Sequence, residues 1–308
     1  MEVVGPGEAS VRGGAAVTIG AFDGVHLGHR RLLELLRRYA AELDVPAAVV
    51  TFDRHPATVI RPESAPLLLT DLDQKLELLA SCGIDLTVVV PFDRARADES
   101  AEDFVDEVLV GALRTRRVVV GADFHFGHGR KGNVALLEEL GRVDGFEVDG
   151  VQLSRDGGEP VSSTRIRGLL ARGDVAAAAS LLGRPHQVRG TVVRGDGRGA
   201  GLGFPTANVA VPPGIAVPGT GIYAGGYGRP DGTRYAAAVS VGRRPTFYDD
   251  DRRPPLVEAF VLDFGEDLYG EEGRVSFDEK LRDEQRFERV EDLVAQMRHD
   301  VDRVRRIR

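Results

Sequence analysis

The feature that most constrains the fold is an alternation of short apolar runs with helical patterns over the first half of the chain. Apolar runs recur at 15–22, 46–52, 84–92, 116–124 and 146–153, and helical patterns fall between them at 30–43, 71–83, 100–113 and 133–140. Strands that alternate with helices in this way form parallel sheets covered by helices. We therefore expect an α/β domain whose ligands bind at the carboxyl ends of its strands.

The pattern changes near residue 183. Two more helical patterns, 162–170 and 174–183, precede β-like runs at 188–193, 206–211, 221–228, 234–242 and 256–264, and a helical pattern closes the chain at 289–307. Gly/Pro turns separate the β-like runs, and Asp231-Gly232 marks a hairpin. These signals predict a small all-β barrel with a C-terminal helix. We expect two domains, residues 1–183 and 184–308.

Composition narrows the class of protein. The chain has 308 residues, a formal net charge of −8 and a single cysteine, Cys82. One cysteine excludes an internal disulfide, and the negative charge argues against a general nucleic-acid binder. No apolar run approaches the roughly 20 residues of a membrane helix, and no basic head with an apolar stretch opens the chain. We expect a cytoplasmic protein that acts on anionic small molecules, not on nucleic acid or membrane; weak self-association stays open.

The first chemical motif is "GAFDGVHLGH" (20–29), which follows the first predicted strand. His26 and His29 stand three residues apart where a helix begins, and a helix start offers free N–H groups and a positive dipole end to phosphate. Gly28 allows close approach of the backbone to a ligand. Two alternatives are a metal-binding pair, although helical zinc motifs use i,i+4 spacing, and a buried histidine beside a solvated one.

The second motif is "VSSTRIRGLL" (161–170). Ser162, Ser163 and Thr164 stand at a predicted helix start, where hydroxyl groups cap free N–H groups. Arg165 and Arg167 add positive charge and forked donors that suit phosphate. The alternative is an ordinary capped helix with surface arginines. The position after the last strand of the sheet favours a phosphate site.

The third motif is "GDGRGAGLGFPTAN" (195–208). A glycine-rich loop can close over a nucleotide, but no Gly-Lys-Ser/Thr follows, so the loop is not a P-loop. Thr206 and Asn208 supply hard oxygen atoms that suit Mg²⁺ and phosphate. The alternative is a flexible hairpin.

Several single residues are further candidates. Glu258, in the predicted strand 256–264, shares a face with Phe260 and Leu262. An acid on such a face is costly unless it is paired or functional. The alternative is a different register with Glu258 in solvent. Residues at the ends of two other strands are candidates for lining the site and could equally be turn residues: His55, Asp123, Phe124 and Phe126.

These motifs, in this order and with "VVTFDRHP", "VEAFVLDF" and "LRDEQRF", resemble one family over nearly the whole chain. The family is the bacterial bifunctional riboflavin kinase/FMN adenylyltransferase, also called FAD synthetase. The resemblance implies a Rossmann-like nucleotidylyltransferase domain that converts FMN and ATP to FAD and pyrophosphate. It also implies a barrel that phosphorylates riboflavin with ATP to give FMN. Both reactions of the family use Mg²⁺.

The resemblance also implies roles for residues of the first domain. His26 and His29 would hold the ATP phosphates and stabilise charge as the FMN phosphate attacks the α-phosphorus. The remaining ATP-binding positions would be Gly20, Phe22, Asp23, Ser162, Ser163, Thr164, Arg165 and Arg167. The flavin would lie against His55, Asp123, Phe124 and Phe126.

In the second domain, Thr206 and Asn208 match the family's ligands of Mg²⁺ and ATP, and Glu258 matches the base that activates the ribityl hydroxyl. Gly195, Gly199 and Gly203 belong to the nucleotide loop, and Arg282 lies in the stretch that closes over the flavin.

One departure from the family bears on function. The glycine-rich loop carries Ala200 and Gly201 where the family usually has an arginine, which weakens its grip on phosphate. Two alternatives to the bifunctional enzyme follow. One is a paralogue that retains only FMN adenylyltransferase activity, and the other is a flavin-binding regulator without turnover.

Overall fold

The computed structural model describes residues 1–307 except 10, 12, 153, 154, 196, 197 and 243–254, and the side chains of residues 155, 198 and 200 also lie outside the description. The chain divides into two compact units, Met1–Ser163 and Thr164–Arg308. The sequence places the domain boundary some twenty residues later, at 183/184. Within the described residues, no helix has the length and apolar character needed to cross a membrane.

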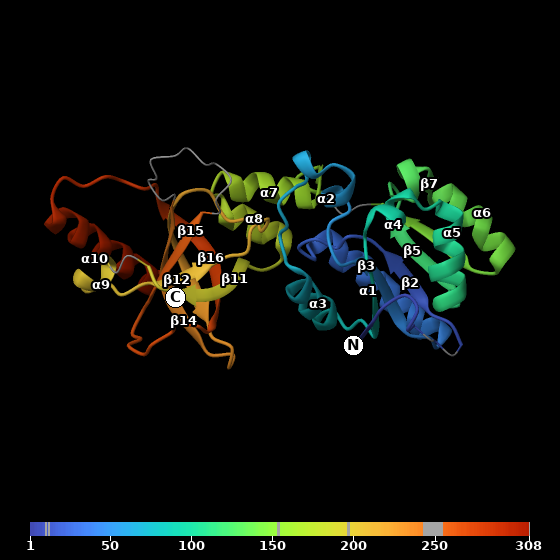
Figure 1. The fold of residues 1–308 in the computed structure, drawn as a ribbon, viewed down its shortest axis with the longest axis horizontal. Coiled ribbons are helices and arrows are strands. Elements are labelled where there is room, and N and C mark those ends of the chain that lie inside the picture. The colour runs from blue at the N-terminus through green and yellow to red at the C-terminus, as the bar shows by residue number, and fades with distance from the viewer. Residues whose placement is uncertain (10, 12, 153–154, 196–197, 243–254, 308) are drawn as a thin grey trace. The chain divides into compact units, whose positions relative to one another are not determined.

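The first unit is built on a parallel sheet, as the alternation predicts (Figure 1). Its six described strands lie in the order β1-β4-β3-β2-β5-β8. Their bounds are β1 (Glu2–Val4), β2 (Ala16–Ile19), β3 (Ala47–Phe52), β4 (Leu86–Val90), β5 (Arg117–Gly121) and β8 (Glu147–Val151). From β2 the chain proceeds outward through β3 to β4 and then returns to the other side of β2 with β5. The carboxyl ends of β2 and β5 therefore flank a topological switch point, where open α/β sheets bind ligands.

Helices cover both faces of this sheet, and side chains of alternating strand residues form a core on each face. Buried residues of α1 (Leu27–Leu43) and α3 (Leu72–Ser81) pack on one face with Ala16, Val49 and Val119. Helices α5 (Ala101–Phe104), η2 (Val105–Ala112) and α6 (Val134–Asp144) pack on the opposite face. The shorter elements are α2 (Ala57–Ile60), η1 (Pro62–Ser64), α4 (Arg94–Asp98), η3 (His128–Arg130), and the paired strands β6 (His125–Phe126) with β7 (Gly132–Asn133) and β9 (Arg155–Asp156) with β10 (Glu159–Pro160).

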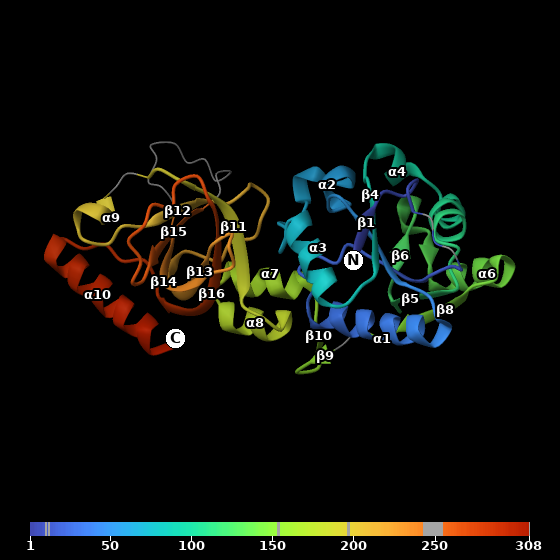
Figure 2. The same cartoon turned by 90° about the horizontal axis from the view of Figure 1, so that it is seen from below.

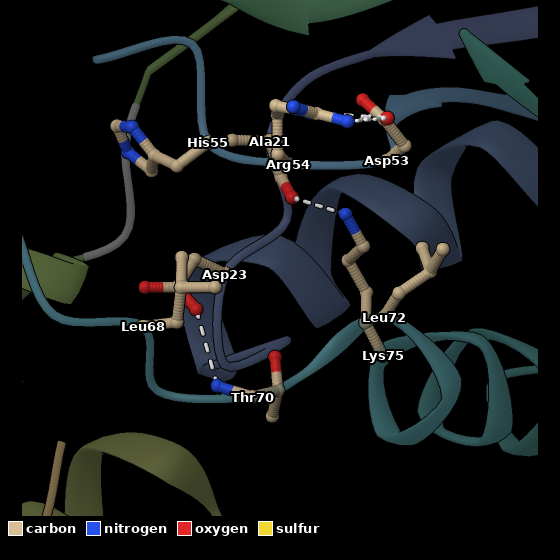
Figure 3. A pocket seen from close by; sticks show the side chains of 9 residues that line it. All are labelled: Ala21, Asp23, Asp53, Arg54, His55, Leu68, Thr70, Leu72 and Lys75. Carbon is tan, nitrogen blue, oxygen red and sulfur yellow. Dashed lines mark hydrogen bonds and ion pairs between the residues drawn. The ribbon is translucent and has the colours of Figure 1, made fainter. Parts of the chain in front are cut away.

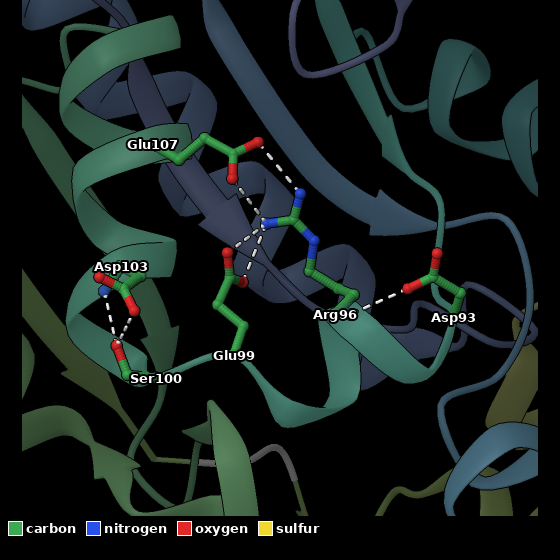
Figure 4. A network of polar contacts seen from close by, with 6 residues as sticks. All are labelled: Asp93, Arg96, Glu99, Ser100, Asp103 and Glu107. Carbon is green, nitrogen blue, oxygen red and sulfur yellow. Dashed lines mark hydrogen bonds and ion pairs between the residues drawn. The ribbon is translucent and has the colours of Figure 1, made fainter.

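The predicted helix 100–113 is only partly an α-helix. Ser100 caps it as expected, because its hydroxyl accepts from the Asp103 backbone N–H at 3.0 Å. After α5 the chain continues as a π-helix, η2, which is a rare conformation. An arginine holds this segment, since the Arg96 guanidinium contacts Glu99 at 2.8 Å and Glu107 at 3.0 Å (Figure 4). The network ties α4 to η2.

The second unit is a closed antiparallel barrel, as predicted. Its strands follow the order β11-β12-β15-β14-β13-β16 in the described residues. Their bounds are β11 (His186–Val193), β12 (Ala207–Ala210), β13 (Gly221–Gly228), β14 (Arg234–Gly242), β15 (Leu256–Val261) and β16 (Glu272–Arg282). The predicted hairpin at Asp231-Gly232 joins β13 to β14, and Gly232 takes a φ of 88° there. The helices are α7 (Ser163–Ala171), α8 (Val175–Leu182), α9 (Arg198–Gly201) and α10 (Val290–Ile307), the last of which is visible in Figure 2.

Helix α10 packs on the outside of the barrel, against β13 and β14. Val304 of α10 is fully buried and joins Ala224, Leu262 and Leu281 in a cluster, with Phe260 packed beside them. Along β15 the barrel interior receives Val257, Ala259 and Val261, so the alternate residues face outward. Glu258 therefore shares the outer face with Phe260, as predicted, and is half-buried there.

Candidate active sites

The histidine motif forms the start of a helix. Helix α1 begins at Leu27, three residues before the predicted start, so His29 lies in its first turn and His26 is the N-cap. The His26 Nδ1 accepts from the His29 backbone N–H at 3.3 Å. Because Nδ1 is the acceptor, the neutral ring carries its proton on Nε2. A helix of 17 residues thus directs its positive end toward the carboxyl edge of the sheet.

The loop before this helix has an unusual backbone. Phe22 and Val25 have φ values of 48° and 38°. The second of these is strained, because Val is β-branched. The backbone at Gly28 packs closely, since a Cβ there would lie 3.1 Å from the His26 ring and 3.2 Å from the Val161 carbonyl oxygen. Strain of this kind persists only where surrounding contacts hold it, and it clusters at functional sites.

The two imidazoles stack on each other. Their ring centroids lie 3.6 Å apart with the planes 16° from parallel, and Phe22 lies 5.1 Å from the His29 ring. The pKa of His29 lies well below its usual 6.5, mainly because of burial and then because of the nearby His26 and Lys75. His29 Nδ1 is buried and has no hydrogen-bond partner among the described atoms. At neutral pH the pair therefore presents a neutral His29 at the helix start.

Asp23 anchors the loop to a distant segment. Its Oδ1 accepts from the backbone N–H groups of Leu69 at 2.8 Å and Thr70 at 3.2 Å, and the Thr70 hydroxyl accepts from the Gly24 N–H at 3.1 Å. The Ser163 hydroxyl donates to the Asp23 carbonyl oxygen at 2.9 Å. The structure thus joins Ser163 of the second motif to the first motif, across 140 residues of sequence. Ser162 lies in the same unit, whereas Thr164, Arg165 and Arg167 begin the second unit in α7.

A pocket opens beside this loop at the carboxyl ends of β2 and β3 (Figure 3). It is lined by Ala21, Asp23, Asp53, Arg54, His55, Leu68, Thr70, Leu72 and Lys75. His55, a sequence candidate, lies here, and its Nδ1 accepts from the Ala57 N–H at 3.1 Å. Sequence reasoning missed Lys75, which occupies one position of an ordinary amphipathic helix. Its only sequence signal is a lysine on a helix that packs against the sheet.

Asp123, Phe124 and Phe126 follow β5, at the same edge of the sheet as the histidine loop. Asp123 is exposed, and its carbonyl oxygen lies 2.8 Å from His125 Nδ1. The rings of Phe124 and Phe126 stack with centroids 5.5 Å apart, and both pack on the core cluster. These three residues do not line the pocket of His55. Phe124 and Phe126 form a partly exposed aromatic surface on the side of β2 opposite β3, and Asp123 lies next to them in the sequence.

In the second unit, Asn208 of β12 lies under the glycine-rich loop. A Cβ on Gly195 would fall 2.4 Å from the Asn208 Nδ2, so a larger residue there would displace the Asn208 amide. The Asn208 Oδ1 is buried and has no hydrogen-bond partner among the described atoms. Thr206 is half-buried two residues earlier, and Gly203 bends the loop with a φ of 85°. The Gly199 carbonyl oxygen accepts from the Phe204 N–H at 2.9 Å, and the side chain of Ala200 lies outside the description.

Strand pairing brings the other candidate residues of the second unit onto one row. Asn208 pairs with Glu258 across β12 and β15, and Glu258 pairs with Ser240 of β14. Ile222 of β13 pairs with Ser240 on one side and with Arg282, the last residue of β16, on the other. Directly paired residues project on the same side of a sheet, so Asn208 and Glu258 are neighbours on the outer face. The Arg282 side chain contacts Asp300 of α10 at 2.8 Å.

The folds of the two units define a class: a Rossmann-like α/β unit with a parallel sheet, followed in the chain by a closed β-barrel unit, each with a candidate nucleotide site. Residues 8–165 match the family model of FAD synthetase, and residues 182–308 match that of riboflavin kinase. The chain is 39% identical to the bifunctional riboflavin kinase/FMN adenylyltransferase of Escherichia coli K12, over 93% of this chain and 90% of that protein. The chain therefore belongs to the family of bifunctional riboflavin kinase/FMN adenylyltransferases.

Other relatives agree with this assignment. The Haemophilus influenzae and Bacillus subtilis proteins of the same description are 36% and 33% identical, over 94% and 93% of this chain and 92% and 90% of those proteins. A crystal structure from Streptococcus pneumoniae, titled a macrolide-efflux protein, matches with a TM-score of 0.87 and 29% identity, over 99% of both chains. That title describes the neighbour, whereas both family models and the curated relatives of this chain carry flavin-enzyme descriptions.

Proposed function

We propose that this chain converts riboflavin to FMN in its second unit and FMN to FAD in its first, with ATP as co-substrate in both steps. The two family models match in this order along the chain. The observation that carries the first activity is the stacked pair of His26 and His29 at the start of α1, on a loop held by Asp23. The proposal includes a cytoplasmic location, Mg²⁺, and a functional domain boundary at 183/184.

For adenylylation, a phosphate oxygen of FMN attacks the α-phosphorus of ATP. The new P–O bond forms as the bond to the β-phosphate oxygen breaks, and pyrophosphate leaves. The start of α1 and the Nε2–H of His26 stabilise the charge that develops on the phosphates. No protein nucleophile is needed, because catalysis here is positioning and electrostatic stabilisation. Ser163 contributes to the phosphate site, because its hydroxyl is bonded to the Asp23 carbonyl oxygen. Phosphate-binding roles for Ser162, Thr164, Arg165 and Arg167 rest on the resemblance of their motif to the family. The partly exposed Phe124 and Phe126 offer an aromatic surface to the flavin.

For phosphorylation, the terminal ribityl hydroxyl attacks the γ-phosphorus of ATP, the β–γ bridge bond breaks, and ADP leaves. Glu258 accepts the hydroxyl proton, since a half-buried carboxylate next to the candidate phosphate site is placed to do so. The residues present fit Mg²⁺, because the buried Oδ1 of Asn208 lacks a partner among the described atoms and is a hard oxygen. Thr206 would be the second ligand, and bound Mg²⁺ would neutralise charge on the ATP phosphates.

Product analysis tests the proposal against its alternatives. The protein is incubated with riboflavin, ATP and Mg²⁺, and the flavins are separated by chromatography. FAD formed from riboflavin supports the bifunctional enzyme. FAD formed only when FMN is supplied indicates a paralogue with adenylyltransferase activity alone, the variant that the loop change at Ala200 favours. Bound but unchanged flavin indicates a regulator and contradicts the proposal.

Two substitutions separate the sites. His29→Ala is expected to lower FAD formation from FMN by at least 100-fold and to leave FMN formation from riboflavin unchanged. Glu258→Gln is expected to do the reverse, because it removes only the proton acceptor of the kinase. Rates of both half-reactions in both variants provide the measurement. A substitution that lowers both rates equally would contradict the two-site assignment.

A further inference from the structure

Lys75 is a buried cation that the mechanism above does not use. It lies in the first turn of α3 and is 7% exposed. Its ammonium donates to the Phe52 carbonyl oxygen at 2.8 Å and to the Thr51 hydroxyl at 3.0 Å. It also donates to the Ala21 carbonyl oxygen at 3.3 Å, the contact that Figure 3 shows. An ammonium has three protons, so these three acceptors engage all of them. Lys75 therefore acts on the protein around it and not on a bound phosphate.

The three acceptors lie where the site is assembled. Thr51 and Phe52 end β3, and Ala21 directly precedes the positive-φ residue Phe22. The Thr51 hydroxyl itself donates to the Ala21 carbonyl oxygen at 3.3 Å, which closes a small network. The segment just before α3 holds the other side of the loop through Asp23 and Thr70. The loop before the two histidines is therefore hydrogen-bonded at two places, by α3 and by the segment that precedes α3.

We propose that Lys75 is a positioning residue for FMN adenylylation, which fixes the loop 20–26 so that His26 and His29 face the nucleotide phosphates. The inference rests on the proposed adenylyltransferase function of the first unit. The positive φ angles of Phe22 and Val25 need such an external hold. A neutral side chain at position 75 would leave the Ala21 and Phe52 carbonyl groups without this donor and release the loop.

The charged groups around Lys75 predict how the rate of adenylylation depends on pH. Burial lowers the pKa of Lys75 to about 8, and the carboxylates of Asp23 and Asp53 oppose this shift. Arg54 and His55 also line the pocket, and His29 lies within the field of the ammonium. Above pH 8 the ammonium loses a proton and one of its three hydrogen bonds. Adenylylation should therefore decline on the alkaline side with a midpoint near pH 8.

The test uses the full-length protein with Lys75→Met, Lys75→Arg and, as a matched control, Arg38→Met. Arg38 is an exposed cation of α1 whose ion-pair partner is Glu42, at 3.6 Å. Initial rates of FAD formation from FMN are measured from pH 6.5 to 10, with kcat and KM for ATP determined separately. Lys75→Met is expected to lower kcat at least tenfold at pH 7 with less than a threefold change in KM. Riboflavin phosphorylation by the same sample, which is expected to change less than twofold, measures the amount of intact second unit. The thermal unfolding transition of the full-length protein, followed by far-UV circular dichroism, measures folding of the first unit.

Lys75→Arg is expected to recover part of the rate and to move the alkaline midpoint upward by at least one pH unit, because a guanidinium stays charged. Wild-type rates for Lys75→Met, or an unchanged alkaline midpoint in Lys75→Arg, would overturn the inference. If Lys75→Met does not fold, the pH profile of Lys75→Arg decides alone. An inactive wild-type protein would count against the proposed function and not against this role of Lys75.

Discussion

At the scale of single residues, two histidines show how burial sets chemistry. His29 is kept neutral at a helix start, where the positive end of α1 and the nearby His26 and Lys75 oppose a further positive charge. His186 of β11 is kept neutral for packing alone, being 2% exposed and stacked 6.3 Å from Phe277. Its Nε2 lies 2.8 Å from the Ala216 carbonyl oxygen, so the ring donates there. Burial lowers the pKa of His186 to about 4.

The stability of the barrel should therefore depend on pH. The folded pKa lies below the unfolded value, so between pH 6.5 and about 4 the unfolded chain binds the extra proton. Stability is full above pH 6.5 and is lost as the pH falls, by about 2 kcal/mol from this group between pH 7 and 5. His186→Gln keeps a donor for Ala216 but does not titrate. Urea unfolding at pH 7 and at pH 5 should show a smaller loss of unfolding free energy in the variant than in the wild-type protein. An equal loss in both proteins would contradict this account.

At the scale of elements, the first unit contains a segment whose helix type departs from the sequence pattern. The π-helix η2 follows α5 directly, and Arg96 connects it to α4. The Arg96 side chain is 17% exposed and that of Glu99 is 16% exposed, so water screens this pair weakly. Contacts with Glu107 and Glu99 raise the pKa of Arg96 above its ordinary value. The network stabilises a helix type that is rare in proteins.

Removal of this arginine should destabilise the first unit. Arg96→Met is expected to lower the free energy of unfolding by about 2 kcal/mol, since the largely buried Glu99 and the more exposed Glu107 both lose their partner. Arg94→Met is the matched control on the same helix, because Arg94 is 74% exposed and pairs with Asp98 at 3.1 Å. An exposed pair of this kind contributes roughly 0.5 kcal/mol or less. Thermal unfolding of both variants provides the measurement, and equal melting temperatures would show that the network is not stabilising.

At the scale of the whole molecule, the compact units and the family models divide the chain at different places. The units meet between Ser163 and Thr164, whereas the two models leave residues 166–181 unmatched. Helix α8 fills part of this interval and contacts β11 and β16. Its buried residues are Val175, Ala178, Leu181 and Leu182. The interval therefore belongs structurally to the barrel.

Two fragments test this assignment. A fragment of residues 164–308 is expected to unfold cooperatively and to phosphorylate riboflavin. A fragment of residues 184–308 lacks α8, exposes the apolar surface that α8 covers, and should melt at a temperature about 5 °C lower or more, an order-of-magnitude expectation for losing several buried side chains. Calorimetry and kinase assays provide the measurements. Equal melting temperatures would show that α8 adds no stability to the barrel.

The sequence by itself determined the fold class, because hydrophobic periodicity is local. Its motifs, through their resemblance to a known family, also indicated both activities. It did not predict β16, where Asp278, Glu279 and Lys280 follow Phe277 and a change of register interrupts the apolar alternation. It did not predict β1, whose three residues are too few for a periodic signal. Both strands are defined by their pairing with distant strands.

Only the tertiary structure decided how the candidate residues are held. The stacking of His26 on His29 depends on a helix that starts at Leu27, and a histidine N-cap has no strong sequence signal. Lys75 reads as a surface cation in a helical pattern, and its burial follows from how α3 packs beside the ends of β2 and β3. Periodicity reports which side of a helix is buried, but the partners of a buried charge come from segments that the sequence separates by tens of residues.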